Sequence, residues 1–249
     1  NNPAAEYVLS IAMILFGVNF NLYYFLLNQR GKEVFRNEEL RFFLALIGGA
    51  ILLIMINIGD TYDSLEHLFR DVLFTVSTVI STTGYATADF DGWPLFSHII
   101  LLILMFSGGM AGSTAGGLKV SRLLIYVKTV FREIKLTLQP LRVLPITVDG
   151  EPLAEPFIRK TFIYFGVYIA VFLVGLLVVS ITQDGFLTAF SAVTATINNI
   201  GPGMGVVGPT GSYASFTGLT KLVLTLLMIL GRLEIYPMII LFNYKVWRS

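Results

Sequence analysis

Two short polar segments lie between hydrophobic stretches, and their residue types suit the binding of a dehydrated cation. They are residues 81–85 and residues 196–203. Each follows a short apolar run and contains glycine beside hydroxyl or amide side chains. Backbone at membrane depth that is neither helix nor closed sheet must be buried in protein or line water. Its carbonyl oxygens can then replace the hydration shell of a cation. An ordinary extracellular turn is the alternative, but two such segments in matching surroundings favour ion binding.

The candidate ligands are backbone carbonyls around two glycines, Gly84 and Gly201. Glycine at these points lets carbonyls turn toward a common axis without a clash from Cβ. If the preceding apolar runs are helices that stop halfway across the membrane, their partly negative C-terminal ends favour a cation there. Two such segments cannot surround an ion alone, so we expect others from a second chain or a preceding part of the protein. The predicted ion-binding residues are Thr82, Thr83, Gly84, Tyr85, Asn199, Ile200, Gly201 and Pro202.

A glycine-rich run, residues 107–117, interrupts the middle of another apolar stretch, residues 95–130. Each helical glycine costs about 1 kcal/mol relative to alanine, so a continuous helix is not expected. We interpret the run as a mobile gate beneath the ion-binding segments. A packing seam of small residues is the alternative. A phosphate-binding loop is disfavoured, because no strand precedes the run and no Gly-Lys-Ser/Thr ends it. The predicted gate residues are Ser107, Gly108, Gly109, Gly112, Ser113, Thr114, Gly116, Gly117 and Arg232.

Arg232 and Glu234 lie within the last apolar span. A charge inside a membrane is costly, which makes it a functional candidate. A structural pair of these two residues is the alternative, but residues two apart do not face each other on a helix. We expect Arg232 to face the pore, as an electrostatic barrier or by binding carbonyls of the glycine-rich run.

The composition is that of a polytopic membrane protein. Of 249 residues, 55% are hydrophobic and 13% are charged, and the mean hydropathy is +0.76; soluble domains carry about 25% charged residues. The absence of cysteine excludes disulfides, thiolate catalysis and Cys-bound metals. His67 and His98 lack metal-ligand spacing. No acid–base groups at membrane depth have catalytic spacing, so we do not expect an enzyme. The chain opens without methionine, and we expect it to be the later part of a longer protein.

The apolar runs predict an all-helical protein with two repeated units, each ordered as full span, half-length helix, polar segment and full span. Full spans are expected at 4–27, 42–58, 161–181 and 216–242, and half helices at 72–80 and 186–195. Asp149-Gly150 predicts the turn of a small hairpin. Residue by residue, the match between repeats is weak; Phe74 and Phe190 are the pair that we align.

The basic residues support this topology, because re-entrant half helices place nearly all basic loops on one side, which is then cytoplasmic. The opposite side is acidic and would concentrate cations; ordinary solvated acids of loops are the alternative. Because the basic residues are sorted by side, nucleic acid is not an expected partner. Lys128, Arg132, Lys135 and Arg142 predict a docking face for an acidic or nucleotide-binding partner, with contact to the lipid bilayer surface as the alternative.

Segments 82–90, 108–120, 198–203 and 231–234 together resemble the Trk/Ktr/HKT superfamily of potassium transporters, and most of all the membrane subunit of the bacterial Trk uptake system. The resemblance covers the whole chain, apart from Ala115, where glycine is usual. It implies four potassium-channel-like units of outer helix, re-entrant pore helix, filter loop and inner helix. The chain would hold an inner helix of the preceding repeat (1–27), a cytoplasmic loop (28–41), a third repeat (42–131, filter 81–87, broken inner helix 94–131), a cytoplasmic connection (132–159) and a fourth repeat (160–249, filter 198–203).

The same resemblance implies K⁺ at Thr83, Gly84, Ile200 and Gly201, no cofactor, a bacterial cytoplasmic (inner) membrane, a homodimer and a cytoplasmic ring of nucleotide-binding regulatory subunits. We therefore expect potassium uptake through a glycine-based filter, gated by the glycine-rich run and Arg232. An ion-coupled transporter of another solute is the alternative, although the run carries no ionisable residue before Lys119. Selectivity for K⁺ or Na⁺, channel or symport action, and the regulatory nucleotide stay open.

Overall fold

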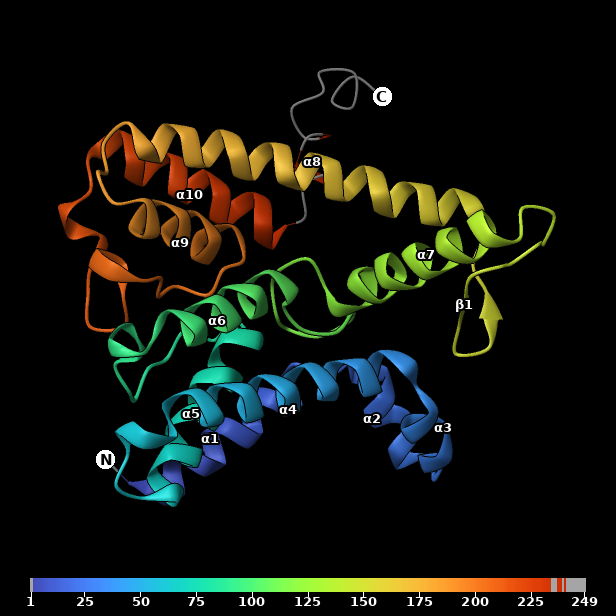
Figure 1. Cartoon of the computed structure of the whole chain (residues 1–249), viewed down its shortest axis with the longest axis horizontal. Helices are drawn as coiled ribbons and strands as arrows, with labels where there is room; N and C mark the ends of the chain where they lie inside the picture. The colour runs from blue at the N-terminus through green and yellow to red at the C-terminus, as the bar shows by residue number, and fades with distance from the viewer. Residues whose placement is uncertain (1, 234–236, 239, 241–249) are drawn as a thin grey trace.

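The structure, a computed structural model, describes residues 2–233, 237, 238 and 240. Over these residues the regular secondary structure is helical apart from one small hairpin, which confirms the expected all-helical fold. In Figure 1, helices α8, α9 and α10 form one group and α1, α4 and α5 another, with α6 and α7 running between them. Within these groups, α5 packs against α1 and α4, and α9 packs against α8 and α10.

The helices are α1 (Pro3–Phe16), α2 (Phe20–Leu27), α3 (Gly31–Arg36), α4 (Glu38–Ile58), α5 (Leu65–Ile80), α6 (Leu95–Ser107), α7 (Val120–Leu138), α8 (Glu155–Ser180), α9 (Phe186–Ile197) and α10 (Gly218–Arg232). Short 3₁₀ turns lie at Gly59–Thr61, Phe90–Gly92, Gly205–Val207 and Tyr213–Ser215. The hairpin joins β1 (Thr147–Val148) to β2 (Glu151–Pro152). Asp149 and Gly150 at its turn have φ of +53° and +87°, as a two-residue hairpin requires.

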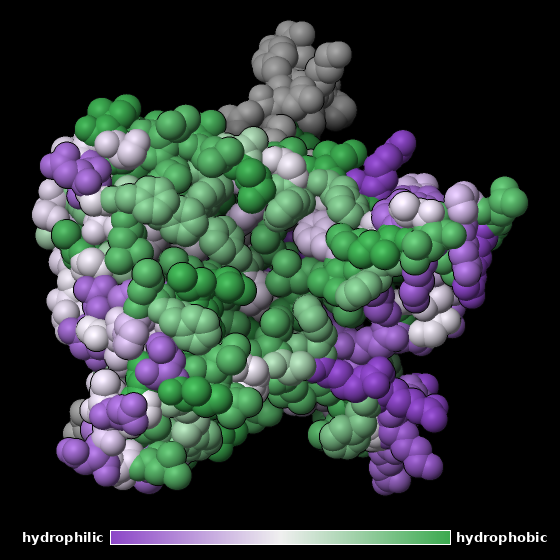
Figure 2. Space-filling view, viewed as in Figure 1, coloured by the Kyte–Doolittle hydropathy of each residue, from purple (hydrophilic) through white to green (hydrophobic). Residues whose placement is uncertain are grey.

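Two of the expected spans are long, apolar helices. These are Glu38–Thr61, formed by α4 and the following turn, and Glu155–Ser180, which is α8. Figure 2 shows an apolar surface between two more hydrophilic ends. We call the end that carries α3, the C-terminal half of α7 and the hairpin the basic end. Of the expected span 216–242, α10 accounts for Gly218–Arg232, and most of residues 233–242 lie outside the described part of the chain.

The span expected at residues 4–27 is broken by a bend near Asn19, one of the two asparagines that interrupt its apolar sequence. Helices α1 and α2 meet at an angle of 95°. The Asn19 side chain caps α2 by accepting the Asn21 N–H. Backbone groups freed at the bend bond to the glycine-rich run: the Gly17 carbonyl accepts from Met110, and the Phe20 N–H donates to Gly112. The bend is therefore satisfied by tertiary contacts that hydropathy does not report.

The first half helix is longer than expected, because α5 begins at Leu65 rather than at residue 72. Its first two turns carry charge, and the charged side chains are paired. Arg70 contacts Glu6 of α1 at 2.8 Å and Glu66, one turn earlier in α5, at 2.9 Å. Pairing offsets the cost of burying these groups, so the polar stretch stays helical against α1.

Candidate ion pathway and gate

The two half helices, α5 and α9, end in the same backbone motif. Thr82 and Asn199 are left-handed, with φ of +55° and +57°. The next N–H, of Thr83 or Ile200, bonds to the carbonyl five residues earlier, at 3.0 and 2.8 Å. This is a Schellman ending, in which a left-handed residue turns the chain out of the helix. It makes Thr82 equivalent to Asn199, Thr83 to Ile200 and Gly84 to Gly201.

This register corrects the alignment of Phe74 with Phe190 by one residue. The hydroxyl of Ser77 donates to the Leu73 carbonyl at 2.6 Å, and that of Thr194 donates to the Phe190 carbonyl at 2.8 Å. These bonds are equivalent, so Phe190 corresponds to Leu73. The sequence alignment paired two phenylalanines by side-chain type, whereas the repeats match in their backbone ending and in the positions of their hydroxyl groups.

The structure brings the two predicted filter segments into contact. Gly84 has φ +82°, and a Cβ atom there would lie 2.0 Å from the Ile200 carbonyl oxygen and 3.4 Å from Pro202. Gly201 has φ +110°, with open space around its missing Cβ. Glycine is therefore required at position 84 by both conformation and space, and at position 201 by conformation.

Polar side chains of α8, α9 and the segment itself hold the second predicted filter segment in place. Asn198 accepts the Tyr168 hydroxyl at 3.0 Å and donates to the Thr194 carbonyl at 2.9 Å. Asn199 donates to the Met228 carbonyl of α10 at 3.0 Å. Ser191 accepts the Met204 N–H at 2.8 Å. Each of these side chains has hydrogen-bond partners in neighbouring helices or loops, and such a network fixes the directions of the carbonyls in the segment.

Tyr213 contacts the candidate site, and the sequence did not reveal it. Its hydroxyl donates to the Gly201 carbonyl at 2.7 Å. Burial raises the pKa of the Tyr213 hydroxyl, which therefore stays protonated as a donor. A carbonyl oxygen has two lone pairs, so it can accept this bond and still coordinate an ion. Tyr213 lies in a loop without hydrophobic periodicity, which is why no sequence signal marked it.

Asp91 links the two repeats beyond the filter segments. Its carboxylate accepts the Gly205 N–H at 2.7 Å. In the sequence, Asp91 is only one acid among several on its side of the membrane. In the structure it also ties the segment after the first filter to the segment after the second.

The glycine-rich run is a loop between α6 and α7, bonded on several sides. We call residues 108–119 the glycine loop. Besides its bonds to the α1–α2 bend, its Ala111 N–H donates to Glu39 of α4 at 2.7 Å. Its Gly116 N–H donates to the Thr82 hydroxyl at 2.8 Å, and a Cβ on Gly116 would lie 2.6 Å from the Asn198 carbonyl. The loop therefore lies directly against both filter segments.

The loop folds back on itself through its glycines. A Cβ on Gly108 would lie 2.2 Å from the Gly116 carbonyl, and one on Gly117 would lie 3.0 Å from the Gly108 Cα. Ala115, where the family usually has glycine, is buried. A Cβ added to Gly109 would lie 2.6 Å from the Ala115 Cβ. A methyl group at position 115 is thus accommodated because position 109 is glycine.

Arg232 contacts the glycine loop from α10. Its Nη1 donates to the Thr114 carbonyl at 2.8 Å. The preceding Gly231 allows α10 to approach α9, since a Cβ there would lie 1.7 Å from the Ile197 carbonyl. A cavity of about 320 Å³ is lined by the glycine loop together with Gly231 and Arg232. The expected carbonyl contact of Arg232 is present, and its gating role stays a prediction; Glu234, the alternative partner, lies outside the described residues.

Two predicted gate residues make local hydrogen bonds, one at the end of α6 and one within the glycine loop. The Ser107 hydroxyl donates to the Leu104 carbonyl at 2.7 Å, where α6 ends, and the Ser113 hydroxyl donates to the Met110 carbonyl at 2.7 Å.

The two histidines make local contacts. His98 contacts the Phe90 carbonyl at 2.9 Å, and His67 lies 3.3 Å from the Asp71 carboxylate. Over the described part of the chain, no group of His, Cys, Asp or Glu is arranged to hold a metal ion.

Comparison with known proteins agrees with this architecture. A family model described as TrkH, cation transport protein, matches residues 1–248. The Trk system potassium uptake protein TrkH of Salmonella typhimurium is 34% identical over 252 residues, covering 100% of this chain and 52% of that protein. TrkG of Escherichia coli is 35% identical over 255 residues, covering 100% and 51%. The chain thus spans about half the length of these curated relatives.

The crystal structure of the potassium transporter TrkH from Vibrio parahaemolyticus matches with a TM-score of 0.88 at 33% identity, covering 99% of this chain and 53% of that chain. These relatives are transport proteins rather than enzymes. This chain is a multi-pass component of a bacterial inner membrane. From its match to the family model over nearly its whole length, the chain belongs to the TrkH family of cation transport proteins.

Proposed function

We propose that the full-length protein takes up potassium across the cytoplasmic membrane through a pore to which this chain contributes two repeats. One observation carries the proposal: two glycine-centred segments with the same backbone ending touch at Gly84 and Ile200, and the glycine loop lies against both. The names of the relatives, as potassium uptake proteins, support the choice of ion. Further filter segments must come from outside this chain.

In this proposal the filter consists of Thr82–Gly84 with Tyr85, and Asn199–Gly201 with Pro202. Their carbonyls replace water around K⁺, with Thr83, Gly84, Ile200 and Gly201 at the ion. Helices α5 and α9 end immediately before the two segments, so their partly negative C-terminal ends favour a cation there. The ion is the cargo, and the chemistry needs no cofactor.

The gate is the glycine loop together with Arg232, and the basic end is cytoplasmic. The loop blocks the path below the filter while Arg232 holds its Thr114 carbonyl. Opening moves the loop aside. The alternative of an ion-coupled carrier for another solute would require ionisable groups at the broken segment, and the loop has none before Lys119.

The direct test is flux through the purified full-length protein in liposomes. We expect uptake of rubidium, a potassium analogue, to exceed sodium uptake and to persist without any second solute. Equal rubidium and sodium flux would identify a sodium-permeable member of the superfamily. Rubidium flux that occurs only with a co-transported solute would favour the carrier.

The Tyr213→Phe substitution should lower the potassium-to-sodium permeability ratio. It removes the hydrogen bond to the Gly201 carbonyl and little else. A lost hydrogen bond of about 1 kcal/mol corresponds to a roughly fivefold change in ion preference. The measurement is the reversal potential under mixed potassium and sodium gradients. Tyr24→Phe, on the exposed face of α2, is the matched control and should change nothing; an equal ratio in both variants would exclude Tyr213 from filter positioning.

We also propose that the protein forms a homodimer and binds a cytoplasmic nucleotide-binding ring through its basic end. Two of the four predicted docking residues are engaged within the chain: Lys128 pairs with Glu38, and Arg132 with Glu155. Lys135 and Arg142 are exposed on the same end. The docking proposal therefore rests mainly on these two side chains.

Reversing both charges, in Lys135→Glu with Arg142→Glu, should weaken co-purification with cytoplasmic regulatory subunits about tenfold, as expected when two exposed ion pairs are lost. The control exchanges the residues while keeping the charge, as Lys135→Arg with Arg142→Lys. Unchanged subunit binding, with lost binding to anionic vesicles, would show instead that this face contacts the lipid surface.

A further inference from the structure

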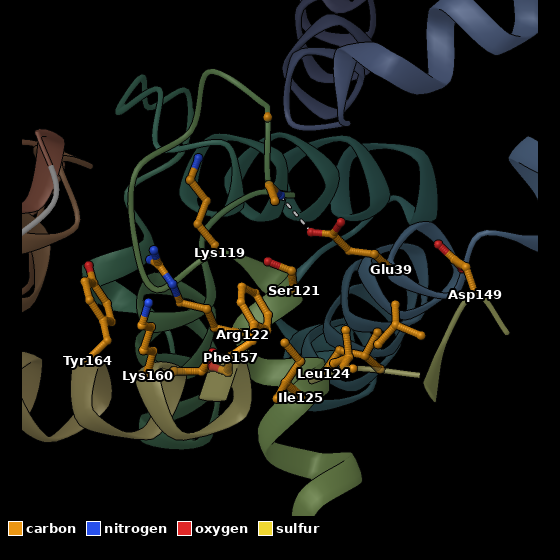
Figure 3. Close-up of a pocket in the computed structure, with 15 residues that line it drawn as sticks. Glu39, Lys119, Ser121, Arg122, Leu124, Ile125, Asp149, Phe157, Lys160 and Tyr164 are labelled. Atoms are coloured by element: carbon orange, nitrogen blue, oxygen red, sulfur yellow. Dashed lines mark hydrogen bonds between the residues drawn. The ribbon is translucent and has the colours of Figure 1, made fainter. Parts of the chain in front are cut away.

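A cavity of about 540 Å³ opens beside the glycine loop at the basic end of the molecule. Figure 3 shows it between the start of α4, the start of α7, the hairpin and α8. Its wall is partly apolar, through Leu124, Ile125 and Phe157. Nothing in the proposed ion pathway uses this space, although Ala111 and Gly112 of the loop form part of its boundary.

The charged groups of the cavity are divided between two sides. Lys119, Arg122 and Lys160 lie on one side in Figure 3, and Glu39 and Asp149 on the other. Both carboxylates already accept backbone N–H groups. Glu39 accepts from Ala111 at 2.7 Å, as the dashed line in Figure 3 shows, and Asp149 accepts from the Glu38 N–H at 2.7 Å.

The three basic side chains of the cavity are held in different ways. The Arg122 guanidinium lies 4.0 Å above the Tyr164 ring, which orients its donor edges. Lys119 donates to the Ala115 carbonyl at 2.7 Å. Lys160 is exposed, and among the described residues it makes neither a hydrogen bond nor an ion pair. Three cations thus lie on one side of the cavity, and the two acids on the other side accept backbone amides.

We propose that this cavity binds the phosphate headgroup of an anionic phospholipid, and that the bound lipid favours opening of the glycine loop. A free phosphate would match the cations alone. A lipid also matches the apolar wall and the position of the cavity between helices near the cytoplasmic membrane surface, where basic pockets receive lipid headgroups. The binding site stands on geometry, whereas its effect on opening rests on the proposed function of the loop.

Lys119 provides the link between lipid and loop. Its Nζ holds the carbonyl of Ala115, next to Thr114, whose carbonyl Arg232 holds from the other side. A phosphate is a stronger partner for an ammonium group than a neutral carbonyl is. When Lys119 binds a headgroup phosphate instead of the Ala115 carbonyl, the loop loses one of its restraints. A ligand that binds better to the loosened state shifts the population toward it.

The first test measures binding without any transport. Native mass spectrometry of the full-length protein, with phosphatidylglycerol or phosphatidylcholine added, reports which lipid is retained. We expect retention of phosphatidylglycerol to weaken about fivefold in Lys160→Gln and again in Arg122→Gln. Arg159→Gln, one residue earlier on α8 and outside the cavity lining, is the matched control. Equal retention by Lys160→Gln and wild type overturns the site, and this exposed position tests it even if Arg122→Gln fails to fold.

The second test measures the effect on the loop. Rubidium flux in phosphatidylcholine vesicles should rise several-fold when phosphatidylglycerol is included, and the rise should disappear in Lys160→Gln. Inorganic phosphate added to phosphatidylcholine vesicles should have no effect; an equal rise would identify a free-phosphate site and overturn the lipid assignment. If rubidium flux is the same with and without phosphatidylglycerol, the link between lipid and loop is overturned, and the proposed function is unaffected. A protein without flux in any vesicle contradicts the proposed function, while mass spectrometry still decides the binding site.

Discussion

The Gly84→Ala substitution should lower the potassium-to-sodium permeability ratio about tenfold or more, equivalent to about 1.4 kcal/mol in relative ion preference. Position 84 has φ +82°, a conformation that costs an L-residue about 1–2 kcal/mol. The new Cβ would also lie 2.0 Å from the Ile200 carbonyl oxygen. Because that neighbour is backbone, rotation of a side chain cannot relieve the clash, and carbonyls of both filter segments must move.

Substitutions at two further glycines distinguish the backbone strain at position 84 from the steric clash of its new Cβ. Gly201→Ala imposes similar backbone strain at φ +110° but meets open space, so we expect a smaller fall in the ratio. Gly48→Ala, on α4 with nothing near its missing Cβ, should leave the ratio unchanged. The measurement is the reversal potential of the full-length protein in liposomes under mixed gradients. A normal ratio in both Gly84→Ala and Gly201→Ala at equal expression would remove these two glycines from the filter.

The Arg232→Ala substitution should raise basal rubidium flux about tenfold or more. It removes the charge-assisted bond to the Thr114 carbonyl, and such bonds contribute about 1.5–3 kcal/mol. Without it the glycine loop loses its restraint from α10, and the closed position is less populated. Arg232→Lys keeps the charge but lacks the planar fork. Low flux in Arg232→Lys indicates an electrostatic barrier, whereas raised flux indicates that the hydrogen bond to the loop is what closes the path.

Deleting part of the glycine loop should raise flux as well, and the deletion and Arg232→Ala should combine non-additively, because both weaken one contact. Arg159→Ala, an exposed cation on α8, is the control for loss of positive charge and should leave flux unchanged. Wild-type flux in both the deletion and Arg232→Ala at equal expression would show that the loop is a packing seam and that Arg232 is structural.

Local signals were sufficient for the class of fold and for the segments of the candidate site. Apolar runs predict membrane helices wherever they occur, and glycines within them mark places where helix is unfavourable. Gly84, Gly201 and the glycine loop were found in this way. The Asp149-Gly150 turn was found because its left-handed conformation suits these two residues.

The partners of these segments depended on packing between parts of the chain that are distant in sequence. Hydropathy marks residues 4–27 as one apolar span, but it does not show that the backbone groups of the bend at residues 17–19 bond to Met110 and Gly112. The residue-by-residue correspondence between the two repeats became clear only from their matching helix endings. Backbone hydrogen bonds define this correspondence, and side-chain types do not. Glu39 and Tyr213 carry no local signal. Each acts on a single backbone group, the Ala111 N–H or the Gly201 carbonyl, and only the folded chain determines which donor meets which acceptor.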